Sequence, residues 1–319
     1  MLAVSGRSRE IPWAPDEGVS PPSVCYSCVV DAGPKFIYQL WVWVTTLVHC
    51  AGVPSTDLYV HIVRRESPSM PVEEFLRGEC IPFSYIEPFG DGRFCNKLEQ
   101  LDTPALRARE FAVLCDTDLA FLSALDPWIG LGTICAKEVD FPNPPIELLE
   151  PLYRRAGFDR FPDRKRCSFS DAETYLTNCN GGIYIFRTTI FDDLLPRWKR
   201  WVFWVLEQRD LLERHMLHVS QISFSMAVWE MGESIVPLPK IVNFPTHVPV
   251  SLYDPHNDVP LVLHYHDRVN DDGGLGKVGV SLIDRRIARV NETLSRIPKP
   301  LVIERALRTF VTERSASSP

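Results

Sequence analysis

Apolar runs free of polar residues and long enough to span a membrane are missing from this 319-residue sequence. The most apolar stretch, residues 36–53, is about the minimum spanning length, but it contains Gln39, two threonines and His49. A buried helix explains this stretch better than a span. The N-terminal stretch MLAVSGRSREIPWAPDEG is polar and lacks the apolar segment of a signal peptide. We therefore expect a soluble protein.

An excess of positive charge is also missing. The sequence has 34 Lys and Arg against 41 Asp and Glu, which gives a formal net charge of −7 and a pI near 5.7. This balance argues against nonspecific nucleic-acid binding. A bound phosphate must be met by a few positioned cations, a metal ion or backbone N–H groups, because the overall charge does not attract it.

A disulfide framework is not indicated either, because the nine cysteines are odd in number and show no repeated spacing. We expect reduced thiols and a cytoplasmic protein. Cys25 and Cys28 form a C-x-x-C pair, but on a strand their side chains point to opposite faces. No second pair completes a zinc site, so neither redox nor zinc chemistry is predicted.

What the sequence does contain is typical of a globular protein with a large core: 45% of its residues are apolar and 24% are charged. Strands are predicted at residues 24–31, 57–63, 80–89, 110–116, 132–138, 175–187 and 260–267. Helices are predicted at residues 35–52, 96–106, 189–212, 214–231 and 280–297. This order predicts an α/β fold with a mainly parallel sheet covered by helices on both faces.

We expect one domain, over residues 23–298, and we find no internal repeat. Residues 1–22 are predicted to form a flexible arm and residues 299–319 a polar tail. The proline-rich, charged stretch at residues 141–166 is interpreted as an excursion over the active face.

The strongest signal for chemistry is an apolar strand that runs directly into Asp116, Thr117 and Asp118. Two carboxylates at the end of a buried strand are costly unless something compensates them. Mg²⁺ and Mn²⁺ prefer oxygen ligands and are natural compensators, and open α/β sheets bind ligands at this end of their strands. The alternative is an acidic turn in which Asp118 caps the next helix.

A second signal is the segment NCNGGIYIFR, in which Asn180, Gly181 and Gly182 interrupt a strand. Paired glycines in a strand mark a bulge or the close approach of a ligand to the backbone. The Asn180 amide offers hydrogen bonds to a sugar hydroxyl. A simple strand bulge explains the segment equally well.

A third signal is the segment LVLHYHDRVNDDGGLGKVG. His264 and His266 lie two apart on a predicted strand, so they share one face, and imidazole is a ligand for Mn²⁺ as well as Zn²⁺. The glycine-rich loop that follows lacks the P-loop spacing, but its Lys277 can close over a diphosphate. The alternative is an edge-strand histidine pair beside a mobile hairpin.

Weaker candidates lie elsewhere in the chain. Lys97 is either a donor-phosphate contact or a solvated helix lysine. Gln221 is one of many residues that can reach the site. The tryptophans at positions 198, 201 and 204 favour helix packing over a sugar platform.

Together these stretches resemble the glycogenin-like and galactosyltransferase-like enzymes of the glycosyltransferase family 8 type. The matching segments, in order, are SCVVDAGPKF, NKLEQL, VLCDTD, CNGGIYIF and LHYHD, and the resemblance spans roughly residues 24–279. It implies a GT-A fold, which is Rossmann-like with a mixed, mainly parallel sheet flanked by helices. It also implies a nucleotide-binding half over about residues 23–120 and an acceptor-side half over about residues 121–298.

The resemblance also implies roles for matching residues. Asp118 and His264 would be metal ligands, with His266 as the alternative histidine, and Asp116 would contact the metal or the ribose. The remaining donor-binding and catalytic positions would be Val29, Val30 and Asp31 by the base and ribose, Lys97 and Lys277 by the phosphates, and Asn180, Gly181 and Gly182 at the donor sugar.

The implied reaction transfers a hexose from a UDP- or GDP-sugar to a hydroxyl group of a saccharide or other acceptor, with Mn²⁺ or Mg²⁺ and with retention. Inversion would require a carboxylate base, for which Asp171 and Glu173 are candidates. One alternative is a sugar nucleotidyltransferase, although the usual Gly- and Arg-rich N-terminal loop is absent. Another is a noncatalytic carbohydrate- or protein-binding module on the same fold.

Overall fold

The computed structural model describes residues 22–65 and 70–317, so the arm expected at residues 1–22 lies almost wholly outside the described residues. The strands are β1 (Val24–Val30), β2 (Leu58–Val63), β3 (Phe83–Ile86), β4 (Phe111–Cys115), β5 (Leu119–Phe121), β6 (Ile134–Glu138), β7 (Arg164–Arg166), β8 (Glu173–Tyr175), β9 (Cys179–Arg187), β10 (Ile235–Pro237), β11 (Phe244–Pro245) and β12 (Val262–His264). The α-helices are α1 (Pro34–His49), α2 (Met70–Gly78), α3 (Pro104–Arg107), α4 (Ile146–Arg155), α5 (Phe191–Leu206), α6 (Arg209–Leu212), α7 (Val219–Met231), α8 (Ser281–Arg296) and α9 (Leu301–Ser317).

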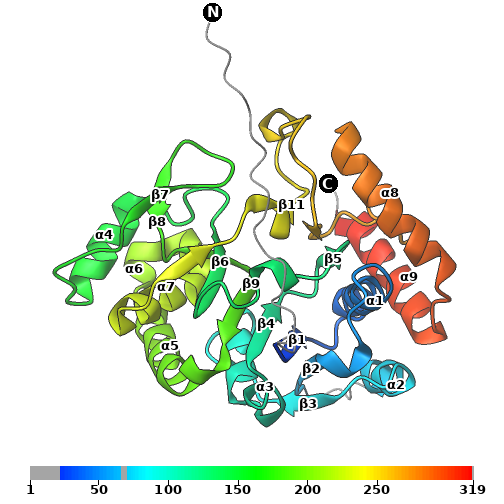
Figure 1. Ribbon diagram of the computed structural model, residues 1–319, viewed down its shortest axis with the longest axis horizontal. Helices are drawn as coiled ribbons and strands as arrows, with labels where there is room; N and C mark the ends of the chain where they lie inside the picture. The colour runs from blue at the N-terminus through cyan, green and yellow to red at the C-terminus, as the bar shows by residue number, and fades with distance from the viewer. Residues whose placement is uncertain (1–21, 66–69, 318–319) are drawn as a thin grey trace, which may run out of the picture.

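A seven-stranded sheet in the order β10-β6-β9-β4-β1-β2-β3 forms the centre of the molecule (Figure 1). Neighbouring strands are parallel except at β9, which runs antiparallel to both β4 and β6. Every residue of β4 is buried, as expected of a strand covered on both faces. The predicted α/β fold with a mainly parallel sheet is confirmed.

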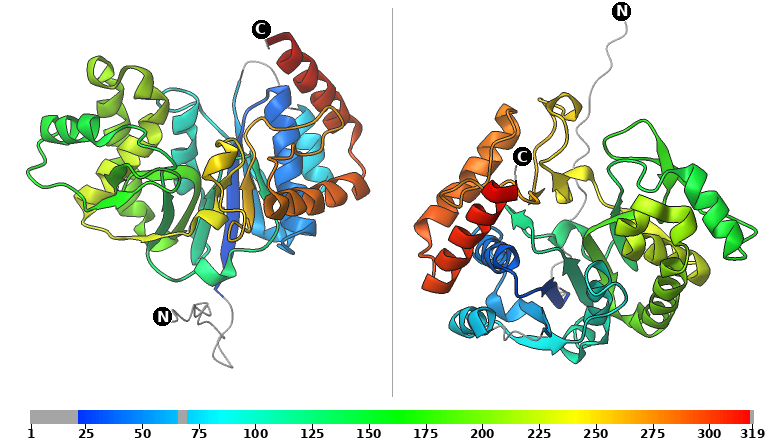
Figure 2. Two further views of the ribbon diagram at one scale, coloured as in Figure 1. Left: turned by 90° about the horizontal axis from the view of Figure 1, so that it is seen from above. Right: turned by 180° about the vertical axis from the view of Figure 1, so that it is seen from behind.

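Helices cover both faces of this sheet and create two apolar cores. Helices α1, α8 and α9 lie on one side and α5 and α7 on the other (Figures 1 and 2). Cys28 packs in the first core and Cys25 in the second, so the two thiols lie on opposite faces as predicted. Trp198 and Trp201 of α5 are buried in the second core, which confirms that they serve helix packing.

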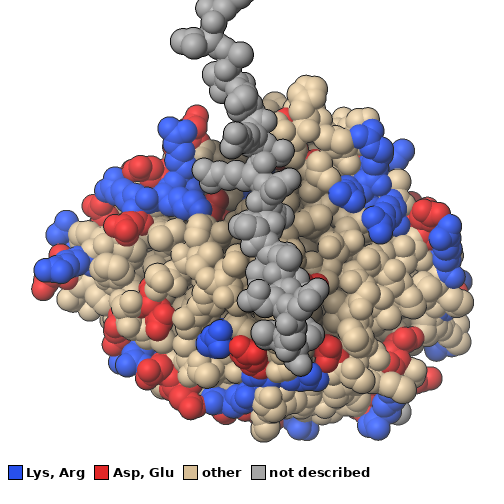
Figure 3. All heavy atoms as spheres, viewed as in Figure 1, with Lys and Arg blue, Asp and Glu red and all other residues tan. Residues whose placement is uncertain are grey.

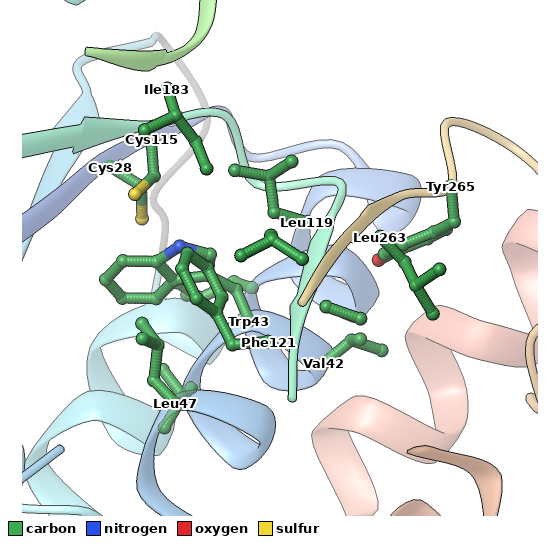
Figure 4. Packing of buried hydrophobic residues seen from close by; sticks show 14 of the residues in the cluster. Cys28, Val42, Trp43, Leu47, Cys115, Leu119, Phe121, Ile183, Leu263 and Tyr265 are labelled. Carbon is green, nitrogen blue, oxygen red and sulfur yellow. The ribbon is translucent and has the colours of Figure 1, made fainter. Parts of the chain in front are cut away.

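Helix α1 is buried along most of its length, as its apolar sequence predicts. Trp43 and Leu47 pack near Leu119 and Phe121 of β5 (Figure 4). Two polar side chains within the helix are hydrogen-bonded: Thr46 Oγ1 donates to the Val42 carbonyl over 2.8 Å, and Gln39 Nε2 donates to the His266 carbonyl over 2.9 Å. No helix in the described residues combines the length and apolarity that crossing a membrane requires.

Two segments differ from the prediction. Residues 299–319, expected to be a polar tail, contain the helix α9, because Ile303, Leu307 and Phe310 recur at helical spacing and are buried against α1. The single helix expected at residues 96–106 is instead a 3₁₀ helix, Phe94–Asp102, followed by α3. Pro104 explains the break, since proline suits the first turn of a new helix.

A small second sheet, in the order β11-β12-β5, positions the histidines. Strand β5 begins directly after Asp118, and β12 runs antiparallel to it with His264 opposite Leu119. The Tyr265 amide donates to the Asp118 carbonyl over 3.0 Å. This register brings the late histidine segment beside the carboxylates that follow β4.

Candidate metal and donor site

The Asp116–Asp118 turn leaves the carboxyl end of β4 and is fixed by its neighbours. The Asp116 amide donates to the Gly182 carbonyl over 2.9 Å. Thr117 is buried and its hydroxyl donates to Gln39 Oε1 over 3.3 Å. Asp118 does not cap a helix, because the strand β5 follows it. Both carboxylates therefore lie at the sheet edge where open α/β folds bind ligands.

Asp118 faces both histidines of the late segment. Its Oδ1 lies 3.2 Å from His264 Nε2, and its Oδ2 lies 3.3 Å from His266 Nδ1. One ligand atom from each of the three side chains lies within 4.8 Å of the others. One carboxylate and two imidazoles are donors that divalent ions of the Mn²⁺ and Zn²⁺ type accept. The residues fit a divalent metal ion.

A second layer of hydrogen bonds fixes the orientation of His264. The Nδ1 atom of His264 lies 2.9 Å from Asn243 Oδ1, and since an amide oxygen only accepts, Nδ1 carries the proton. The other ring nitrogen, Nε2, faces Asp118 Oδ1, and in the neutral form of the ring its lone pair is available to a metal ion. Outer-shell partners of this kind orient metal-binding histidines.

The contact between Asp118 and His264 favours the ionised carboxylate and the protonated imidazole. Burial raises the pKa of the Asp118 carboxyl, but the charge and hydrogen bonds of His264 and His266 outweigh burial and hold that pKa well below its usual range. Burial likewise opposes protonation of His264, but Asp118 outweighs it and raises the pKa of that imidazole. Desolvation and the two neighbouring imidazoles lower the pKa of His247 to about 4.

Asp116 has a different partner. Its Oδ1 accepts a hydrogen bond from Lys97 Nζ over 2.5 Å, and the same ammonium donates to the Gly181 carbonyl. Only 10% of the Lys97 side chain is exposed, so it is not the solvated helix lysine that the sequence also allowed. Asp116 lies outside the set of metal-ligand atoms that Asp118 forms with the histidines.

The Asn-Gly-Gly segment at the start of β9 approaches the cluster closely. A Cβ atom on Gly182 would lie 2.7 Å from Asn243 Nδ2 and 2.9 Å from His264 Nδ1. The Asn180 side chain is fully engaged: it donates to Asp140 over 2.9 Å and accepts from the Gly182 amide and from Asn243. A register shift in β6 lies opposite, between Ala136 and Glu138. The register shift agrees with the bulge that the sequence offered as one explanation, and the Gly182 backbone lies against Asn243 and His264.

The other predicted donor residues are more dispersed. Val29 and Val30 end β1, and Asp31 forms a two-pronged ion pair with Arg65. Lys277 is exposed, and no ion pair joins it to the metal-ligand cluster in the described part of the chain. Gln221 of α7 lies beside Gly181: a Cβ there would be 3.5 Å from Gln221 Nε2.

Several residues of the site carry no recognisable sequence signal. Asn243 lies between a 3₁₀ turn and β11, Asp140 follows β6, and Gln39 is a lone polar residue inside an apolar helix. Each forms a hydrogen bond with a site residue that lies far away in the sequence. The spacing of residues along the chain therefore does not reveal these contacts. His247 contacts His266 edge-on, with ring centroids 4.2 Å apart, and it too was missed.

Comparison with known proteins gives similarity of structure but not of sequence. The sequence matches no family model and no curated protein. An active-site mutant of LgtC is similar, with a TM-score of 0.51 and 13% identity over 88% of this chain and 99% of that one. The galactosyltransferase LgtC with donor and acceptor sugar analogues gives 0.49 at 14% identity, covering 86% and 98%. Mouse xyloside xylosyltransferase 1 gives 0.47 at 13% identity, covering 76% and 97%. The first of these similarities shows a shared fold.

Proposed function

We propose that this chain, which has the GT-A fold, is a metal-dependent glycosyltransferase that moves a hexose from a UDP- or GDP-sugar to an acceptor hydroxyl, with retention. The observation that carries the proposal is the cluster of Asp118, His264 and His266 beside the backbone of Gly181 and Gly182. A protein of the same fold, LgtC, is described as a galactosyltransferase, which supports the same class of reaction here.

The barrier of such a transfer comes from breaking the anomeric C–O bond while negative charge builds on the departing diphosphate. A divalent ion, Mn²⁺ or Mg²⁺, held by Asp118 and His264 would act there as a Lewis acid. Lys97 supplies a fixed positive charge at the same edge of the sheet. Lys277, on the loop after β12, would meet the diphosphate as that loop closes over the donor.

The remaining residues position the donor. Gly181 and Gly182 have no side chains, so the sugar can lie against the β9 backbone. Asn180 fixes that backbone through its bond to the Gly182 amide. Val29, Val30 and Asp31 would lie by the base and ribose, with Arg65 holding the Asp31 carboxylate in place.

Retention is favoured by the positions of the two carboxylates considered as bases for inversion. The Asp171 side chain is 99% exposed beside Arg166, and Glu173 is paired with Arg164. Asp171 lies in the loop between β7 and β8, and Glu173 is the first residue of β8; each pairs with an arginine rather than with a residue of the Asp118 cluster.

We assign donor binding to about residues 23–120 and acceptor binding to about residues 121–298. The nine cysteines are free thiols, which supports a reducing compartment such as the cytoplasm.

Calorimetric titration with UDP-hexoses and GDP-mannose, in Mn²⁺ or in EDTA, tests the proposal. We expect one donor to bind in Mn²⁺, to lose its affinity in EDTA, and to fail to bind Asp118→Asn. The exposed Asp171→Asn variant is the matched control and should bind like the wild type. Equal binding in Mn²⁺ and EDTA would instead indicate a noncatalytic module. Pyrophosphate release from a nucleoside triphosphate and a sugar phosphate would indicate a nucleotidyltransferase.

A further inference from the structure

We infer that one face of this protein docks on an anionic phospholipid membrane. The face is formed by the outer side of α8 and by two loops beside it, residues 246–261 between β11 and β12 and residues 265–280 between β12 and α8. Its positive charge comes from four arginines and its apolar contact from two aliphatic residues: Arg268, Arg285, Arg286 and Arg289, with Val250 and Leu252. The inference goes beyond the proposed function and does not depend on it.

The charge of the chain is unevenly distributed along the sequence. Residues 281–319 carry eight Lys and Arg against four Asp and Glu, although the whole chain has a net charge of −7. Arg285 and Arg289, one helical turn apart on α8, are exposed. Figure 3 shows basic side chains over the end of α8 that is uppermost in Figure 1. The apolar residues of the helix are buried in the first core: Ile283, Ile287, Val290 and Leu294.

The four arginines are not neutralised by carboxylates. None of them forms an ion pair within the part of the chain that the structure describes. Nearby acids have other partners: Asp284 accepts from the Val278 amide over 2.8 Å, and Asp271 pairs with Arg314 over 3.1 Å. Like charges one turn apart on a helix repel one another. An anionic surface placed against them would relieve this repulsion.

Hydrogen bonds join the two loops and α8 into one continuous surface. Arg268 lies at the junction: its Nη1 donates to the Thr246 carbonyl of the first loop, and its Nη2 donates to the Lys277 carbonyl of the second over 3.2 Å. The bond from the Val278 amide to Asp284 then ties the second loop to the first turn of α8. The loops therefore hold a fixed position beside the arginines of the helix.

Two aliphatic side chains project from the first loop. Val250 and Leu252 belong to one 3₁₀ turn and are 54% and 41% exposed. The next residue, Tyr253, is buried, and its hydroxyl donates to the Pro245 carbonyl over 3.1 Å, which holds the turn near Arg268. Aliphatic side chains beside cations suit a membrane interface, because the former enter the edge of the acyl region while the latter meet lipid phosphates.

The apolar pair favours a membrane over nucleic acid, the other large anionic partner. Proteins that bind single strands combine cations with aromatic side chains on which the bases stack. The exposed apolar residues of this face are Val250 and Leu252 instead, which offer no ring for stacking. Contacts to the phosphates of a duplex are made by cations and gain nothing from exposed aliphatic groups.

Cosedimentation of the full chain with lipid vesicles tests the inference. We expect binding to vesicles that contain about one third phosphatidylserine and none to pure phosphatidylcholine, with weaker binding as added salt screens the charges. Arg285→Gln and Arg289→Gln together should weaken binding about 25-fold, because each basic residue near an anionic surface contributes about fivefold. Val250→Ser and Leu252→Ser together should weaken it about tenfold.

Arg197 and Arg200 of α5 provide the matched control. They lie on the other side of the sheet and pair with Asp193 and Glu230. Arg197→Gln and Arg200→Gln together remove the same charge as the α8 variant, but should change vesicle binding by less than about twofold, because this charge is screened from the docked surface. Urea denaturation checks that every variant keeps the fold, as expected for exposed positions.

Several outcomes would overturn the inference: equal binding to the two kinds of vesicle, no binding to either, wild-type binding in either variant of the face, or equal losses in the two arginine pairs. Binding to a labelled oligonucleotide without binding to vesicles would overturn it too and would assign the face to nucleic acid. The donor titration is independent. Phosphatidylserine-dependent binding by a protein that binds no nucleotide sugar would support this inference while contradicting the proposed function.

Discussion

Gly182 determines how closely the β9 backbone approaches His264 and the residues around it. A Cβ atom at this position would lie 2.7 and 2.8 Å from the Asn243 amide and 2.9 Å from His264 Nδ1. We expect Gly182→Ala to displace Asn243 and to free the His264 ring, which lowers metal affinity at least about tenfold. Overpacking of this kind also costs about 1–3 kcal/mol of unfolding free energy. Mn²⁺ titration and urea denaturation measure the two effects.

Gly78 provides the matched control, because a Cβ atom added there meets no atom within 4 Å. Gly78→Ala should leave metal affinity unchanged. Wild-type metal affinity in Gly182→Ala would show that the Asn243–His264 bond does not orient the ligand.

His61 on β2 is a buried neutral imidazole that makes stability depend on pH. Burial lowers its pKa to about 4, while Ser27 and Thr103 occupy its two nitrogens. The unfolded chain, with a pKa near 6.5, binds the proton first, so the contribution of His61 is full above pH 6.5 and is lost as pH falls toward 4. We expect this residue to remove about 2 kcal/mol of unfolding free energy between pH 7.5 and pH 5.

Urea denaturation of the wild type and of His61→Gln at both pH values isolates this contribution. The variant should lose about 2 kcal/mol less on acidification. Parallel pH profiles for the two proteins would show that another group causes the dependence.

At the scale of elements, α9 is a structural part of the first core. Ile303 is fully buried, whereas Leu301 on the same helix is 61% exposed. We expect Ile303→Ala to lower the unfolding free energy by about 2–4 kcal/mol, because it leaves a cavity against α1. Leu301→Ala is the control and should change it by less than about 0.5 kcal/mol. Equal small effects in urea denaturation would mean that α9 does not pack on α1 in solution.

The contrast between β4 and α9 shows what the sequence can and cannot predict. Strand β4 is apolar throughout and ends in two carboxylates, so local pattern alone indicates both the strand and the site. The apolar residues of α9 are interspersed with arginine and glutamate, and the helix is specified by the α1 surface that it covers. Tertiary packing of this kind overrides local polarity.

The site divides in the same way. Asp118, His264 and the glycine pair were recognisable because each stands next to a strand in a compact motif. Asn243 and Gln39 were not, because each is an isolated polar residue whose partner is set by the register of distant strands. Lys97 was recognised, but its pairing with Asp116 depends on the three-dimensional structure.

At the scale of the molecule, the face shown in Figure 3 carries both basic and acidic side chains. They are intermixed over much of this face, and many charged side chains of the protein form ion pairs, such as Arg64 with Glu87 and Arg155 with Asp210. With a net charge of −7, the protein would have to bind the proposed anionic donor through local groups. Under the proposed function, Lys97 and an ion held by Asp118 and the histidines would supply the positive charge that binds the donor.

A bound ion should also stabilise the whole fold, because Asp118 follows the central strand β4 whereas His264 and His266 belong to the late β12 segment. An ion present at about 100 times its dissociation constant adds roughly 2.7 kcal/mol to the unfolding free energy. We expect EDTA to remove this stabilisation from the wild type, in thermal or urea unfolding, and to have no effect on Asp118→Asn.

The pH dependence of this stabilisation has a definite sign. In the metal-free protein Asp118 raises the pKa of His264. The protonated imidazole therefore stabilises the fold, and this contribution is complete below pH 6.5. It is lost as the pH rises through the raised pKa. The ion requires the neutral imidazole and competes with the proton. Stabilisation by Mn²⁺ should therefore be larger at pH 8 than at pH 6, while the metal-free protein shows the opposite trend at this site. Equal Mn²⁺ stabilisation at both pH values would mean that the ion does not bind His264.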